Sequence, residues 1–116
     1  MTATTIYRDK VREMKRHRSD LAPEVMKAFA ALSDAASAPG ALDGKTKELI
    51  ALAIAVINRC DECITVHLQD VLAAGGTKQE IVEALSVAIL MGGGPAVMYS
   101  THALAALKEF EAPQPV

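Results

Sequence analysis

The chain has 116 residues, the length of a single domain that can bury a core of its own. Its formal net charge of −2 leaves no electrostatic attraction for nucleic acid or an anionic membrane, so neither is expected as a partner. Only 3% of the residues are aromatic, so small aliphatic side chains must form the core, which favours closely packed helices.

A soluble cytoplasmic protein is expected from the sequence. Residues 1–20 contain no apolar run and do not resemble a signal peptide. The longest apolar run, Leu49–Ile57, is about half as long as a membrane span. In the cytoplasm structural disulfides are rare, and a pair of cysteines is more often catalytic or metal-binding.

The pattern is helical throughout, since no stretch alternates apolar and polar residues as a half-buried strand does. A first, charged helix is expected over residues 5–17. Asp20 is the expected N-cap of a second helix with Pro23 in its first turn. After the break at residues 37–44, Asp43 is the expected N-cap of a third helix.

The fourth and fifth helices have clear boundary signals. The fourth begins near the two cysteines, with Asn58 as a candidate N-cap, and ends at Gly75 and Gly76. Thr77 and Glu80 form a capping box that opens the fifth helix.

A sixth helix completes the domain. The sequence GGGP at residues 92–95 ends the fifth helix and places a proline in the first turn of the next. The tail, residues 111–116, is expected to fray. The sequence therefore predicts one all-α domain over residues 1–116, with about six helices and no repeat or linker.

Two of these helices are apolar nearly all round, in the segments 49–57 and 81–91. A helix that is apolar on every side must be buried on every side, which a domain this small can hardly provide. We therefore expect a homo-oligomer in which these helices pack across subunits. The alternative is one central helix ringed by the other five.

Cys60 and Cys63 lie three residues apart at the expected start of the fourth helix. The unpaired N–H groups and the positive dipole at a helix N-terminus stabilise a thiolate there. The two sulfurs project from one face and can close a disulfide. His67 follows Cys63 by one turn on the same face and can take a proton from that thiol.

Glu48 is the one charge in the apolar part of the third helix. If the third and fourth helices form an antiparallel hairpin turning at residues 58–59, Glu48 lies about 15 Å and His67 about 10 Å from the turn. A Glu side chain can cover much of that difference, so a proton path from Cys63 through His67 to Glu48 is sterically reasonable. On spacing alone, a role in complementing the helix dipole or in pairing with Lys45 is the simpler interpretation.

The stretch ELIALAIAVINRCDECITVH, residues 48–67, resembles the core motif of the alkylhydroperoxidase D (AhpD)-like proteins of the carboxymuconolactone decarboxylase superfamily. That motif is a Glu, a C-x-x-C that begins twelve residues later, and a His four residues after the second Cys. The matching positions are Glu48, Cys60, Cys63 and His67. The flanking sequence extends the resemblance over residues 42–110.

The resemblance implies an all-α fold around a helical hairpin, assembled as a trimer or hexamer. It also implies a thiol-dependent peroxidase or disulfide oxidoreductase that reduces hydroperoxides through the cysteine pair, with a Glu–His proton relay. No bound cofactor or metal is expected. The disulfide would be reduced by an external dithiol carried by a lipoyl- or thioredoxin-type protein partner.

Two features differ from the peroxidases of this family. These often carry a His just before the second cysteine, where this chain has Glu62, whose carboxylate opposes thiolate formation. The chain is also shorter than the two-lobed peroxidases. The decarboxylase branch generally lacks the cysteine pair, so a lactone decarboxylase is the poorer match.

In the expected reaction, His67 draws the proton from Cys63, which attacks the hydroperoxide and becomes a sulfenic acid. Cys60 then condenses with it to form the disulfide. The external dithiol attacks the more exposed sulfur, expected to be Cys60 at the tip of the helix.

Two alternatives stay open. In the first, Cys60, Cys63 and His67 bind zinc, with His102 as a fourth ligand. In the second, the protein is a helical oligomeric module whose cysteines are incidental. Tyr99 and His102, one turn apart on the last helix, are secondary candidates for a pocket lining, although a core tyrosine and a surface histidine is the simpler interpretation.

Overall fold

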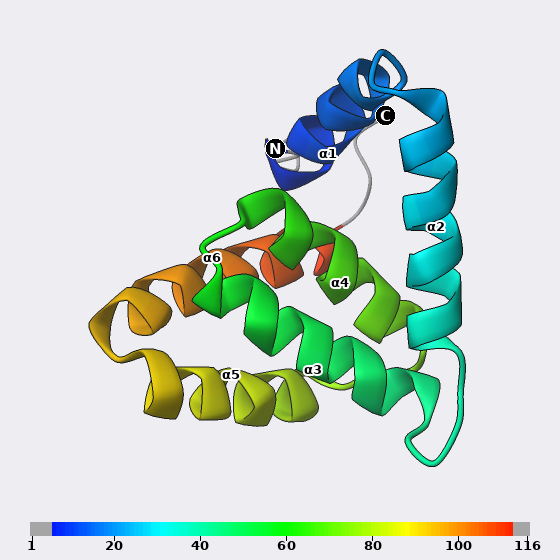
Figure 1. Cartoon of the computed structure of the whole chain (residues 1–116). Coiled ribbons are helices and arrows are strands. Elements are labelled where there is room, and N and C mark those ends of the chain that lie inside the picture. The colour runs from blue at the N-terminus through cyan, green and yellow to red at the C-terminus, as the bar shows by residue number, and fades with distance from the viewer. Residues whose placement is uncertain (1–5, 113–116) are drawn as a thin grey trace.

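The computed structural model describes residues 6–112 and forms six α-helices (Figure 1). Their bounds are α1 Ile6–Arg18, α2 Pro23–Ser37, α3 Gly44–Ile57, α4 Asp61–Ala73, α5 Lys78–Gly92 and α6 Gly94–Glu111. The described residues contain no strand, so the predicted all-α fold is confirmed. No helix among them is long and apolar enough to cross a membrane. Of the tail expected to fray, residues 113–116 lie outside the described residues.

The centre of the fold is the predicted hairpin of α3 and α4. The chain reverses at residues 58–60, where Arg59 adopts a left-handed backbone conformation with φ of 56°. α5 packs along α3, α6 packs against α4, and α1 lies across α4 (Figure 1). Aliphatic side chains from these helices form one buried cluster, which includes Leu52, Ile64, Leu68 and Ile81. The cluster holds the turn and the first residues of α4 in place.

Two helices begin with the caps that the sequence predicts. The side chain of Asp43 accepts the N–H of Thr46 at 2.7 Å. Thr77 and Glu80 form a complete capping box, in which each side chain accepts the other residue's N–H, at 3.1 and 2.9 Å. These local patterns therefore fix the first turns of α3 and α5.

Two other predicted caps are wrong. Asp20 does not cap α2, because the N-cap position falls on Ala22, which makes no side-chain cap hydrogen bond. Pro23, which has no N–H to satisfy, begins that helix without one. Asn58 is the C-cap of α3, and the N-cap of α4 is Cys60.

Two glycines allow α5 to turn closely into α6. A Cβ on Gly92 would lie 2.5 Å from Cδ1 of Ile57, so the end of α5 approaches α3 as only a glycine permits. Gly93 has a φ of 67°, which lets the chain reverse between the two helices.

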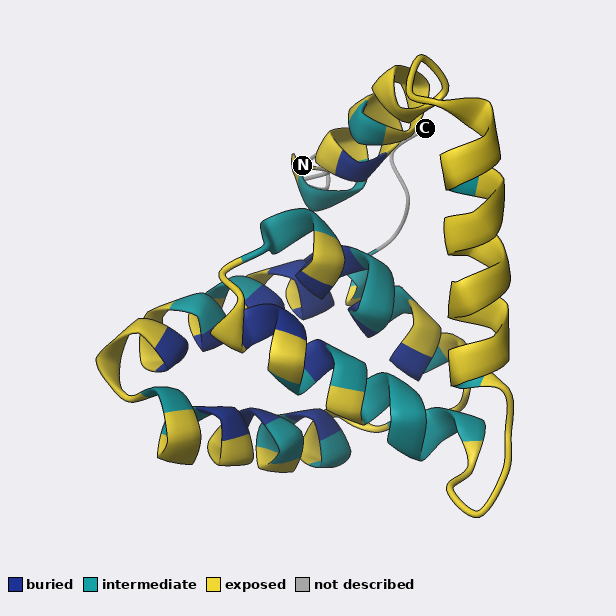
Figure 2. Cartoon of the chain, in the orientation of Figure 1, coloured by how far each residue is buried: buried dark blue, intermediate teal, exposed yellow. Residues whose placement is uncertain are grey.

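α2 stands away from the rest of the chain and has no buried residue (Figure 2). Phe29 on α2 is 59% exposed, Ile54 on α3 is 52% exposed and Leu90 on α5 is 78% exposed. Because one face of α3 is open, the alternative of a central helix ringed by the other five is wrong.

Candidate active site

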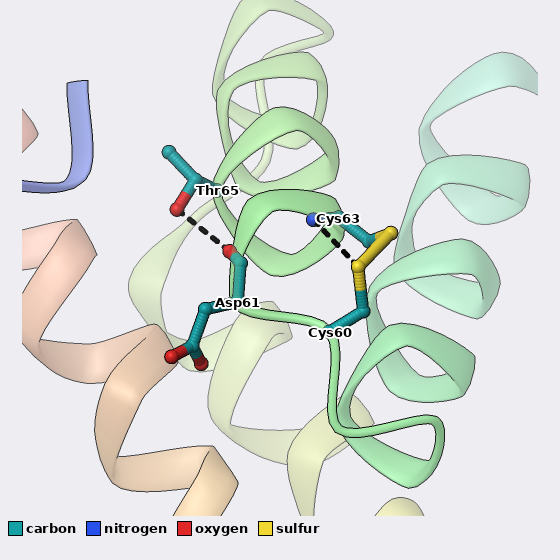
Figure 3. The surroundings of a disulfide bond; sticks show 4 residues. All are labelled: Cys60, Asp61, Cys63 and Thr65. Carbon is teal, nitrogen blue, oxygen red and sulfur yellow. Dashed lines mark hydrogen bonds between the residues drawn. A yellow bond between two sulfur atoms is a disulfide. The ribbon is translucent and has the colours of Figure 1, made fainter. Parts of the chain in front are cut away.

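Cys60 and Cys63 are joined by a disulfide at the first turn of α4 (Figure 3). Cys60 is half-buried and Cys63 is exposed, so the expectation that Cys60 is the more accessible sulfur is wrong. The reason is the N-cap position, in which Cys60 Sγ turns back over the helix and accepts the N–H of Cys63 at 3.3 Å. Cys63 is left facing outward.

The surroundings of the pair affect a thiolate in opposite directions. The N-terminus of α4 and the Cys63 N–H favour negative charge on Cys60 Sγ. The carboxylates of Asp61 and Glu62, also in the first turn, oppose it. The stability of a thiolate at this position therefore depends on the balance between the helix N-terminus and these two carboxylates.

The structure brings Glu48 and His67 into direct contact. Glu48 Oε2 lies 2.8 Å from His67 Nδ1, and the two side chains are 15% and 32% exposed. Lys45, the alternative partner of Glu48, instead forms an ion pair with Glu80 at 2.8 Å. Since Nδ1 is engaged by the carboxylate, it carries a proton and Nε2 is the nitrogen free to exchange one. His67 lies one helical turn after Cys63, and side chains at this spacing are neighbours on the helix surface.

Asp70 is a site residue that the sequence analysis missed. Its Oδ2 lies 3.9 Å from His67 Nδ1, on the side of α4 that faces Glu48. Burial, and secondly the charge of Glu48, raises the pKa of Asp70 above its usual value, while His67 and Lys15 act in the opposite direction. Its position three residues after His67 was the available signal, because residues at that spacing share a helix face.

A shallow cavity of about 170 Å³ opens beside this pair. It is lined by residues of three helices, which include Ser33 and Ser37 of α2, Lys47 and Glu48 of α3, and His67 of α4. It can admit a small molecule to the imidazole, so α2 contributes one wall of the candidate site.

The cysteine and histidine set proposed as a zinc site is not brought together. His102 Nδ1 instead lies 2.7 Å from Oδ1 of Asp61, and the His102 ring contacts the Tyr99 ring with the centroids 4.8 Å apart and the planes tilted by 60°. Among the described residues, one group of three potential metal ligands comes together, namely Glu48, His67 and Asp70, whose ligand atoms lie within 4.8 Å of one another. That group contains neither cysteine.

Comparisons with known proteins agree with this fold. A carboxymuconolactone decarboxylase family protein of Legionella pneumophila superimposes with a TM-score of 0.84 at 40% identity, covering 94% of this chain and 100% of that one. A family protein of Thermotoga maritima, whose description suggests an antioxidative response, gives 0.72 at 37% identity over 78% of this chain and 93% of that one.

A shorter match is to an alkyl hydroperoxide reductase. The alkyl hydroperoxide reductase AhpD of Corynebacterium kroppenstedtii is 39% identical over 46 residues, which are 40% of this chain and 26% of that protein. Residues 23–109 match the profile of the carboxymuconolactone decarboxylase family. The chain therefore belongs to the carboxymuconolactone decarboxylase family, in the superfamily that also contains the AhpD-like proteins.

Proposed function

We propose that this protein is a thiol-dependent peroxidase or disulfide oxidoreductase that reduces hydroperoxides through Cys60 and Cys63. The observation that carries the proposal is the 2.8 Å contact of Glu48 with His67, one helical turn from a cysteine of the disulfide. A carboxylate that fixes the imidazole tautomer leaves Nε2 as a base for a nearby thiol. The similarity to an AhpD and to a family protein connected with an antioxidative response supports the same chemistry.

In the oxidative half of the reaction, His67 takes the proton of Cys63. The Cys63 thiolate attacks the terminal oxygen of the hydroperoxide, the O–O bond breaks, and the alkoxide leaves as an alcohol with a proton from His67. Cys60 then attacks the sulfenic acid on Cys63. The disulfide forms and water leaves.

In the reductive half, an external dithiol attacks the disulfide. Cys63 is the more exposed residue of the pair, so the mixed disulfide forms at its sulfur and Cys60 leaves as a thiolate. The Cys63 N–H and the helix N-terminus stabilise that leaving group. The second thiol of the donor then attacks the mixed disulfide and releases Cys63. The donor ends as a disulfide, and the protein has gained two electrons.

The partners follow from this chemistry. The electron donor is a dithiol on a lipoyl- or thioredoxin-type protein in the cytoplasm, and no cofactor need be bound to this chain. A homo-oligomer, trimer or hexamer, would cover the apolar side chains that α2, α3 and α5 expose.

The test is hydroperoxide consumption measured in parallel with dihydrolipoamide, thioredoxin and glutathione as donors. We expect turnover with at least one dithiol, and its loss in Cys60→Ser and in Cys63→Ser. A sulfenic acid trapped on Cys63 in Cys60→Ser supports the assignment, and one trapped only on Cys60 in Cys63→Ser reverses it.

Metal analysis of protein purified without chelator separates the zinc alternative. Stoichiometric zinc released by blocking the thiols would contradict the redox function. The incidental-cysteine alternative predicts no reversible two-electron couple and no effect of Glu48→Gln on thiol reactivity.

A further inference from the structure

Asp61 lies between the two cysteines in sequence, but its side chain points away from them. Figure 3 shows the disulfide on one side of the first turn of α4 and the Asp61 carboxylate on the other. There Asp61 Oδ1 meets His102 Nδ1 of α6 at 2.7 Å. The two side chains are 26% and 37% exposed, so this contact is partly shielded from water.

The surroundings keep both partners in place. The Asp61 carbonyl oxygen accepts a hydrogen bond from the hydroxyl of Thr65 at 2.9 Å, and the His102 ring makes a tilted contact with the Tyr99 ring. On the α1 side, burial, and secondly the charge of Asp61, raises the pKa of Tyr7. The negative charge of Asp61 therefore acts on a residue of α1 as well as on His102, and at the same range it acts on the sulfurs of the same helical turn.

We propose that His102 is a positioning residue for the cysteine pair: by hydrogen bonding to Asp61 it offsets the negative charge inside the C-x-x-C motif and so sets the balance between disulfide and dithiol. The proposal rests on the redox function proposed above. It gives a role to a histidine that the proposed proton path does not use.

The reasoning is electrostatic. The disulfide carries no charge, whereas the reduced pair can hold a thiolate at the N-terminus of α4. A neighbouring carboxylate therefore raises the free energy of the reduced state and leaves that of the oxidised state nearly unchanged. A donor on that carboxylate withdraws part of its charge, so the His102 contact favours the reduced pair.

The test is the equilibrium of the full chain with dithiothreitol. In this reaction the donor loses two electrons and two protons as its own disulfide closes, and the Cys60–Cys63 bond gains both. We expect Asp61→Asn to raise the equilibrium constant for reduction by at least about threefold, the order expected for one nearby charge. His102→Phe, which keeps a ring against Tyr99 but has no donor, should lower it by a similar factor.

The opposite effects of Asp61→Asn and His102→Phe on the equilibrium constant distinguish this electrostatic role from a purely structural contact. If the contact only holds α4 against α6, both variants loosen the same first turn and move the equilibrium in the same direction or not at all. His102→Asn, whose amide can replace the donor, should restore the parent value. In an Asp61→Asn background, His102→Phe should have little effect.

Glu62→Gln is the matched control. It removes a carboxylate from the same turn, so it should raise the equilibrium constant, but its effect should add to that of His102→Phe. Equal signs for Asp61→Asn and His102→Phe, or simple additivity of the two, would overturn the inference. If the parent protein has a reversible disulfide–dithiol couple and these variants do not shift its equilibrium, only this inference is contradicted. If the parent protein has no reversible couple, the proposed function is contradicted as well.

Discussion

Glu48 and His67 lie 19 residues apart on different arms of the α3–α4 hairpin, and their side chains meet at 2.8 Å. The turn at residues 58–60 places them side by side, and the buried cluster between the arms fixes the register. The carboxylate is the more buried of the two side chains, which strengthens its interaction with the imidazole. The hairpin thus holds the imidazole and its carboxylate partner one helical turn from Cys63.

The first prediction concerns this pair. Glu48→Gln keeps the shape of the side chain but removes the charge that fixes the tautomer and orientation of His67. We expect the reaction of reduced Cys63 with hydroperoxide to slow by roughly tenfold to a hundredfold, the usual range for loss of a group that orients a reactive residue. His67→Gln should slow it by about a hundredfold or more. Stopped-flow measurement of sulfenic acid formation checks both.

Glu83→Gln is the control for that experiment. Glu83 is exposed on α5, and the substitution makes the same chemical change away from the site. If Glu48→Gln slows the reaction no more than Glu83→Gln does, the proton relay is wrong even though the contact is present.

The second prediction concerns Asp70. Its folded pKa is raised above the unfolded value near 3.8, so the folded state favours the protonated form. Ionised Asp70 therefore costs stability at neutral pH, and this cost disappears below the unfolded pKa, where the group is protonated in both states. Asp70→Asn should stabilise the protein against urea at about pH 7, and its advantage should shrink as the pH falls towards about 4.

The same variant should make the thiols less reactive. Asp70 Oδ2 lies 3.9 Å from His67 Nδ1, so its negative charge stands beside the ring that takes the thiol proton in the proposed reaction. A residue that costs stability and supports reaction is typical of an active site. An Asp70→Asn protein that is less stable than the parent at neutral pH would contradict the assignment of the raised pKa.

The sequence predicted local features well and long-range partners poorly. The cap of α3 and the capping box of α5 depend on residues three positions apart, so Asp43, Thr77 and Glu80 could be identified directly. The cap of α4 failed for a tertiary reason. Asn58 is used to end α3, and the reversal through Arg59 leaves only Cys60 in a position to cap the next helix.

The same distinction applies to the site. Family spacing singled out Glu48 and His67, but their contact depends on how the two arms of the hairpin pack. The partner of His102 lies 41 residues away, and no local pattern connects it with Asp61. The zinc alternative included His102 as a fourth ligand because a sequence gives residue type without direction, and the structure aims the His102 ring at Asp61 instead.

A third prediction follows from a contact across the whole chain. Glu109 near the end of α6 is 5% exposed and accepts the N–H groups of Tyr7 and Arg8, both at 3.0 Å. It thus caps the first turn of α1 from 102 residues away. Glu109→Ala would leave these donors without that acceptor, and we expect a loss of about 1–3 kcal/mol in the free energy of unfolding, measured in urea.

Glu111→Ala, an exposed site two residues along, is the control and should change stability by less than about 0.5 kcal/mol. Hydrogen exchange gives a second readout, since the amides of α1 should lose protection before those of α4. Equal effects of the two substitutions would show that the Glu109 carboxylate does not hold α1 in place.

The last prediction tests the proposed assembly. Val25, Phe29 and Leu32 form a stripe along α2, and each is at least 59% exposed. Burial of such side chains against a second copy is worth about 1.5–3 kcal/mol each, and a charge in the stripe would oppose it. We expect the parent chain to show a mass well above its own 12.3 kDa by light scattering, and Phe29→Glu to lower that mass.

Assembly should also affect the chemistry, because α2 supplies a wall of the cavity beside His67 but is held to its own chain mainly at one end. There Lys47 Nζ donates to the carbonyl oxygens of Ala36 and Ala38, at 3.1 and 2.7 Å. Phe29→Glu should therefore also lower hydroperoxide turnover. Ala31→Glu places the same charge on the opposite face of α2 and should leave both mass and turnover near the parent values. The stripe is ruled out as the contact between copies if the parent chain is monomeric at micromolar concentration. It is also ruled out if the Ala31→Glu protein dissociates as readily as the Phe29→Glu protein, because the two positions should differ only if the face that carries Phe29 is buried in the assembly.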